Sequence, residues 1–198
     1  MDPFANVAIS ELEGGESCRS PFVFSEDGKR VSASAKDENS IVVWDVDSGV
    51  EVIRYGDPDG PDLKDFALSP DGRRLAISGR SDRSFNTFTI ELVDIDANSS
   101  VSSTSDASEA SRRLLLNSYP TTMAFSLDGE TLAVACLDGL VRLLDVDLIN
   151  ESRTIDEQSI QVIELGNMGN ATRLRFDAEG EILVAASRQN QIRVWDLG

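Results

Sequence analysis

The sequence predicts an all-β fold assembled from four repeats of one four-stranded unit. An apolar strand, a turn that ends in glycine, a strand of small residues and a strand closed by aspartate recur four times. The closing aspartates are 49, 51 and 51 residues apart, a period typical of folds whose repeats stack on one another. No segment longer than about two turns has apolar residues at helical spacing. We expect one domain over residues 1–198, with repeats at about 22–54, 66–116, 123–163 and 174–198.

The first half of each repeat predicts a β-hairpin. In the first repeat, the alternation around Phe22 and Phe24 predicts a strand with one buried face. Gly28 after Asp27 suits the tight turn that follows, because glycine adopts positive φ without a Cβ clash. The second strand is rich in Ala and Ser, which allows neighbouring sheets to pack closely. The same turn recurs as Asp71-Gly72, Asp128-Gly129 and Glu179-Gly180.

The second half of each repeat predicts two further strands. The third strand ends in a bulky residue followed by aspartate: Trp44-Asp45, Val93-Asp94, Leu144-Asp145 and Trp195-Asp196. Outer strands are expected at 50–53, 114–116 and 160–163, the fourth repeat lacks one, and residues 6–10 have the character of an extra outer strand. Since one such sheet cannot bury both of its faces, we expect the sheets to stack radially as blades.

The repeats resemble the WD-repeat (tryptophan-aspartate) β-propeller family over residues 22–198. The residues that carry the resemblance are the segment from Ser69 to Gly72 and the two Trp-Asp pairs, at matching positions of the repeat. The resemblance implies a β-propeller of four WD-type blades, either a small ring or half of a larger propeller. The chain has no histidine, whereas blades of the family often begin with a Gly-His pair whose histidine joins a buried hydrogen-bond network. We therefore expect blades that depend more on apolar packing.

The composition argues against several functions. The net charge of −17 disfavours both a phosphate backbone and an anionic membrane as partner. Without histidine, and with Cys18 and Cys136 far apart, we expect no metal site and no cofactor. Two reduced thiols and the lack of a signal peptide or a long apolar segment predict a cytoplasmic or nuclear protein that is not secreted.

Residues 98–111 form a serine-rich segment that we expect to be a disordered loop, because it carries little that can be buried. One interpretation is a phosphorylation segment, with Ser103 three residues before Asp106. The alternative is a surface insertion that the fold tolerates.

The resemblance implies a protein–protein interaction scaffold, part of a larger regulatory or signalling protein, that binds proteins or peptides and is not an enzyme. Two alternatives stay open: a hydrolase-like propeller enzyme with a site in the central channel, and a decayed fragment without independent function. In the family, loops between second and third strands line the face most used for binding. The candidate partner contacts in those loops are Lys36, Arg80, Arg83 and Arg188. Carboxylates share these loops, so a mixed, solvated surface is the alternative interpretation.

The number of blades also predicts an oligomeric state. An arc of four blades that does not close leaves unpaired edges and two bare faces, which usually self-associate. We therefore expect a homodimer if the propeller is open, and a monomer if it closes as a small ring.

Overall fold

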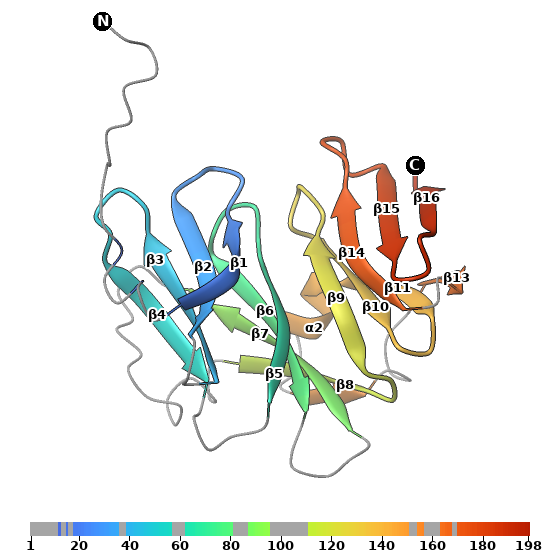
Figure 1. Cartoon of the computed structure of the whole chain (residues 1–198), viewed down its shortest axis with the longest axis horizontal. Helices are drawn as coiled ribbons and strands as arrows, with labels where there is room; N and C mark the ends of the chain where they lie inside the picture. The colour runs from blue at the N-terminus through green and yellow to red at the C-terminus, as the bar shows by residue number, and fades with distance from the viewer. Residues whose placement is uncertain are drawn as a thin grey trace, which may run out of the picture.

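In the computed structural model, the chain folds into four antiparallel sheets that follow one another along the sequence and form an open arc (Figure 1). The structure describes residues 12, 15, 18–35, 39–56, 62–80, 87–95, 111–150, 154–156, 163–167 and 170–198. The expected all-β architecture of repeated sheets is therefore present, and each sheet begins with the strand nearest the inside of the arc.

The order of strands within each sheet follows the chain. Sheet 1 contains β1 (Cys18–Phe24), β2 (Arg30–Ala35), β3 (Ser40–Asp45) and β4 (Glu51–Gly56). Sheet 2 contains β5 (Leu63–Leu68), β6 (Arg74–Arg80), β7 (Phe88–Asp94) and β8 (Ser111–Leu116). Sheet 3 contains β9 (Pro120–Phe125), β10 (Thr131–Cys136), β11 (Leu140–Asp145) and β13 (Ile163–Asn167). Sheet 4 contains β14 (Ala171–Phe176), β15 (Ile182–Ser187) and β16 (Ile192–Asp196).

Three details differ from the expected repeat. The short strand β12 (Thr154–Asp156) pairs in parallel with β8, so sheet 2 gains a fifth strand that the sequence pattern does not predict. The helix α2 (Val146–Asn150) directly follows β11. In sheet 3 the outer strand starts at Ile163, whereas 160–163 was predicted, and 160–162 lie outside the described residues.

The predicted serine-rich loop and the predicted N-terminal strand lie largely outside the description. Residues 98–110 and 6–10 are not among the described residues. Ser111, which we placed in the loop, is the first residue of β8 and pairs with Val93. Ser111 therefore belongs to the outer strand of sheet 2 and not to a loop, whereas the disordered loop expected over 98–110 stays a prediction.

Apolar side chains hold the sheets together face to face. We call the face of a sheet toward the following sheet its leading face, and the opposite face its trailing face. Ile41 and Val43 on the leading face of sheet 1 pack with Phe66 and Leu75 on the trailing face of sheet 2. The same arrangement joins the later sheets, through Ile90, Leu92, Met123 and Phe125 between sheets 2 and 3, and through Ala133, Val141, Leu174 and Leu183 between sheets 3 and 4. The arc is thus a chain of apolar junctions.

On the trailing face of sheet 1, the predicted burial of the first strand is wrong. We expected Phe22 and Phe24 on the buried face of their strand, but they are 51% and 60% exposed. The corresponding Phe66 in sheet 2 is only 6% exposed, because the leading face of sheet 1 covers it. No sheet precedes sheet 1 in the described part of the chain, and these two side chains of its inner strand stay exposed. Leu12 packs on the outer part of the same face, near the buried Trp44.

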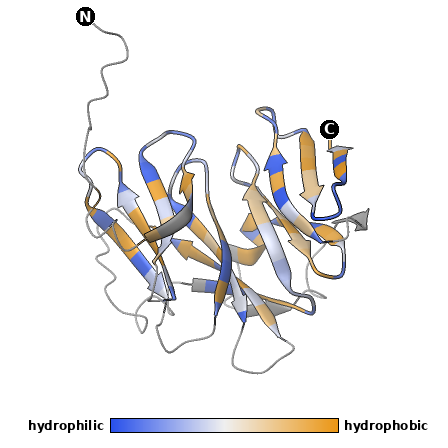
Figure 2. Ribbon diagram, in the orientation of Figure 1, coloured by the Kyte–Doolittle hydropathy of each residue, from blue (hydrophilic) through white to orange (hydrophobic). Residues whose placement is uncertain are grey.

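The leading face of sheet 4 is the other open end of the arc. Ile192 and Val194 are 72% and 63% exposed, although Ile41 and Val43 at the same repeat positions of sheet 1 are almost completely buried. In Figure 2, β15 is mostly hydrophobic, and β16 alternates between hydrophobic and hydrophilic residues. Both ends of the arc therefore present apolar side chains to solvent.

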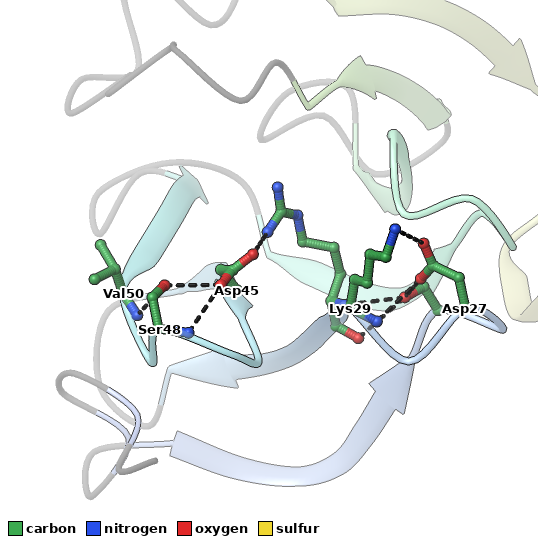
Figure 3. A network of polar contacts seen from close by, with 7 residues as sticks. Asp27, Lys29, Asp45, Ser48 and Val50 are labelled. Carbon is green, nitrogen blue, oxygen red and sulfur yellow. Dashed lines mark hydrogen bonds and ion pairs between the residues drawn. The ribbon is translucent and has the colours of Figure 1, made fainter. Parts of the chain in front are cut away.

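The predicted hairpin signature forms one recurrent hydrogen-bond pattern. The Ser25 hydroxyl donates to Asp27 Oδ1 at 2.6 Å, and the Lys29 amide donates to the same oxygen at 3.0 Å (Figure 3). The Arg30 amide donates back to the Ser25 hydroxyl at 3.0 Å. The same bonds recur around Asp71 and Asp128. These aspartates therefore fix the hairpin between the first and second strands.

The fourth hairpin makes an equivalent hydrogen bond with a different residue. Asp177 stands where the other hairpins have serine, and its Oδ1 accepts the amide of Ile182 at 2.9 Å. Gly180 keeps the positive φ of the signature, at +77°. The carboxylate of Asp177 thus replaces the serine hydroxyl as acceptor for the first amide of the second strand.

The closing aspartates stabilise the end of the third strand. Asp45 Oδ1 accepts the amide and the hydroxyl of Ser48 at 2.9 and 2.8 Å, and Asp45 pairs with Arg30 through its other oxygen (Figure 3). Asp94 pairs with Arg112 at 3.0 Å. Asp145 Oδ1 accepts the amides of Asp147 and Leu148, which caps the first turn of α2, and Asp196 Oδ1 accepts the amide of Gly198 at 3.2 Å.

Candidate functional site

A hollow of about 190 Å³ lies where the inner strands and their hairpins converge. Strands β1, β5, β9 and β14 all contribute to its lining, so every sheet of the arc takes part. Asp65, Thr122 and Met123 line its middle part, and Pro70 and Leu127 contribute from the hairpins. Its lining is largely polar, because the charged Glu26, Arg173, Arg175 and Asp177 also contribute to it. Concave sites that combine apolar contacts with a few placed polar groups are the usual binding sites of proteins. The hollow is therefore the candidate functional site.

Asp65 is the polar group that the fold holds most firmly in this hollow. Its Oδ2 accepts the backbone amide of Met123 from the next sheet at 2.9 Å. The fully buried Ser78 accepts the Asp65 amide at 3.1 Å and donates its hydroxyl to the Asp65 carbonyl oxygen at 3.2 Å. The side chain thus bridges two sheets, and its backbone is fixed from a neighbouring strand.

The environment of Asp65 changes its acidity. Desolvation by burial raises the pKa of Asp65 from 3.8 to about 6. Hydrogen bonds from the amides of Met123 and Phe66 and from Thr122, and the charge of Arg173, oppose this rise. A partly desolvated carboxyl group that titrates near neutral pH, inside a hollow, is a frequent property of functional sites.

The sequence analysis did not single out Asp65. The corresponding positions of the other repeats hold Pro21, Thr122 and Arg173, so the position varies and no shared motif marks it. What could have marked Asp65 in the sequence is that only this repeat has a carboxylate at the position before the first buried residue of the inner strand, here Phe66.

The predicted rim cations are not gathered in the hollow. Arg80 ends β6 in sheet 2, and the exposed Arg188 follows β15 in sheet 4, so sheet 3 lies between them. Neither residue lines the hollow, and Lys36 and Arg83 lie outside the described residues. The role of these four residues in partner binding stays a prediction.

The described residues offer little for other kinds of site. Within the ranges given above, no group of three or more His, Cys, Asp or Glu side chains could hold a metal ion. No helix in the same part of the chain has both the length and the apolar character needed to cross a bilayer. Cys18 on β1 and Cys136 on β10 are in different sheets and are not joined by a disulfide.

A family model matches two segments in the second half of the chain. The family described as WD domain, G-beta repeat matches residues 116–145, which cover β9 to β11, and residues 160–196, which cover β13 and sheet 4. These two segments therefore match WD repeats, as their Asp128-Gly129 turn and their Trp195-Asp196 pair predict. No curated protein sequence matches the chain.

A solved structure supports the fold. The hydrazine synthase of Kuenenia stuttgartiensis superimposes with a TM-score of 0.61 at 16% sequence identity. The match covers 89% of this chain and 45% of the other, so the chain corresponds to less than half of that protein's chain. At this identity the likeness concerns the fold alone, a propeller-like arrangement of antiparallel sheets.

Proposed function

We propose that the chain is a protein–protein interaction scaffold whose partner enters the hollow between the inner strands. Its sheets are four WD-type blades of an open propeller, part of a larger regulatory or signalling protein. WD repeats suggest an interaction scaffold in general terms. The observation that carries the proposal is the hollow itself, which is lined by all four sheets and contains the desolvated Asp65.

The chemistry of the hollow favours a peptide segment with one basic and one apolar side chain. A lysine or arginine of the partner would pair with Asp65, whose desolvated carboxylate gains more from a cation than an exposed one does. An apolar side chain would cover Leu127, which is 41% exposed, beside Pro70. The net charge of −17 attracts basic segments over a longer range.

Two finer features belong to the same proposal. Arg80 and Arg188, which lie in different sheets, are further candidate contacts for acidic groups of the partner, as are Lys36 and Arg83, which lie outside the described residues. We place the protein in the cytoplasm or nucleus, and we infer a non-enzymatic role, because binding explains the hollow without a reacting pair of side chains.

The experiment is a selection of peptides from a random display library on the purified chain, followed by fluorescence anisotropy with each selected peptide. Asp65→Asn and Leu127→Asp alter the hollow, and Leu148→Asp is the matched control, because Leu148 on α2 is equally exposed and does not line it. We expect both hollow variants to bind at least about tenfold more weakly, the cost of one lost hot-spot contact. Equal binding by all variants would contradict the proposal.

A further inference from the structure

The two ends of the arc are complementary to each other. Each internal junction joins the leading face of one sheet to the trailing face of the next. Among the described sheets, none packs on the leading face of sheet 4, and none packs on the inner strand of the trailing face of sheet 1. Ile192 and Val194 are the exposed members on one side, and Phe22 and Phe24 are those on the other.

The strand register shows that the open face of sheet 4 is continuous. Val184 of β15 pairs with Val194 of β16 on one side and with Arg175 of β14 on the other. Ala186 pairs in the same way with Ile192 and with Arg173. Paired residues project from the same face of a sheet, so an aliphatic patch adjoins two arginines on the inner strand.

The arginines suit the aromatic residues of sheet 1. Arg173 occupies the repeat position that Asp65 holds in sheet 2, and Asp65 reaches across a junction to the Met123 amide of the next sheet. The register places Arg173 on the leading face of sheet 4, where it lines the hollow and donates to the Thr172 carbonyl oxygen at 3.0 Å. For sheet 4, the following inner strand would carry Phe22 and Phe24, and guanidinium groups pack favourably on aromatic faces.

From this complementarity we propose that two copies of the chain form a homodimer in which sheet 4 of each copy packs on sheet 1 of the other. The arc opens toward one side, at the top of the view in Figure 1. In this arrangement one twofold rotation relates the copies, so that both junctions form together and the two arcs close into a ring. This inference goes beyond partner binding in the hollow, and the two sites share Phe22, Phe24, Arg173 and Arg175, which also line the hollow.

Leu12 now covers part of the surface that this dimer uses. It packs against the apolar cluster of Val31, Ala33 and Trp44 on the trailing face of sheet 1. Between sheets 1 and 2, aliphatic side chains of the preceding sheet cover the part of the trailing face that Leu12 covers on sheet 1. The second copy would therefore displace Leu12 and replace one apolar side chain by the whole patch of sheet 4.

The test is the mass of the purified chain by size-exclusion chromatography with light scattering, over a wide range of concentration and salt. We expect twice the single-chain mass of 21.5 kDa, and an association that strengthens as salt screens the charge of −17 on each copy. A monomer at every concentration and salt would overturn the proposal.

Variants test which faces meet. Val194→Asp places a charge in one side of the junction and Phe24→Asp in the other, and each should weaken association about tenfold or more. Leu137→Asp, in the exposed turn after β10, is the control and should remain dimeric. Circular dichroism and urea melts establish that each variant is folded.

The mixture of the two variants provides the sharpest result. Equal amounts of Val194→Asp and Phe24→Asp chains should form a heterodimer, because one of its two junctions then contains no substitution. If Phe24→Asp alone stays fully dimeric, sheet 4 pairs with itself and the proposed arrangement is wrong. If Val194→Asp stays dimeric, the open face of sheet 4 is not the interface, and the proposal fails as well.

Discussion

Replacement of Asp65 by asparagine tests whether the folded protein raises the pKa of this carboxyl group. Asparagine has nearly the same shape, and its side-chain oxygen can still accept the Met123 amide, but it carries no charge. The folded protein raises the pKa of Asp65 from 3.8 to about 6 through desolvation. Because the raised pKa belongs to the folded state, the folded state holds this proton more tightly than the unfolded chain does.

The sign and size of the effect follow from this linkage. Below pH 3.8 the carboxyl group is protonated in both states and costs nothing. As the pH rises through 3.8 to about 6, the wild-type protein loses stability, by at most about 3 kcal/mol at neutral pH. Asp65→Asn lacks this loss, so it should match the wild type near pH 4 and exceed its stability at pH 7.

The assay is urea unfolding followed by tryptophan fluorescence at a series of pH values from 4 to 7.5. Asp62→Asn is the control, because the hydrogen bond from Lys64 lowers the pKa of the exposed Asp62 and gives the opposite, smaller pH dependence. Stability curves of wild type and Asp65→Asn that run parallel over this pH range would refute the reasoning.

Three further predictions concern the repeat signature and are all measured by urea unfolding. Trp44→Ala should lower the free energy of unfolding by about 3–5 kcal/mol, because Trp44 is fully buried. Trp195→Ala should lower it clearly less, since Trp195 is only partly buried, and equal losses would contradict this. Gly28→Ala should cost about 1–2 kcal/mol for its positive φ alone, and Gly72→Ala more, because the new Cβ would lie 2.7 Å from Arg30 Cγ; the reverse order would contradict the geometry. Asp128→Ala should lower the free energy of unfolding by about 1 kcal/mol, because the Ser126 hydroxyl and the Glu130 amide lose the carboxylate oxygen to which they donate. An unchanged urea midpoint would show that the hairpin does not need this acceptor.

Local chemistry explains why much of the fold is predictable from the sequence. The turn glycines sit at positive φ and the turn aspartates accept the expected hydrogen bonds, since both requirements are confined to a few consecutive residues. Val93 and Leu144, which replace tryptophan, are as buried as Trp44. Apolar packing thus takes over at these positions, as the lack of histidine led us to expect.

What the sequence did not predict depends on which sheets are neighbours. The strand pattern of Phe22 and Phe24 is the same as in later repeats, but burial requires a preceding sheet, and sheet 1 has none. The pairing of β12 with β8 is similarly non-local. Desolvation raises the pKa of Asp65, and that burial comes from the packing of sheets in the arc, which is not visible in a repeat considered alone.

The two proposals share part of one surface. We propose that the part of the hollow around Asp65 and Leu127 binds a partner, and that the end faces, with Phe24 and Val194, bind a second copy. Phe24 also lines the hollow, whereas Val194 does not. Leu127→Asp and Val194→Asp are therefore the variants that separate the two proposals, because each should leave the other activity in place.

The most direct test of the central claim is hydrogen–deuterium exchange of the chain with and without a peptide selected for binding. A partner in the hollow should protect the amides of β5 and β9 and of the hairpins 69–72 and 126–129, and Asp65→Asn should abolish that protection. Protection confined to the outer strands β4 and β8, with the inner strands unchanged, would show that the partner site lies elsewhere.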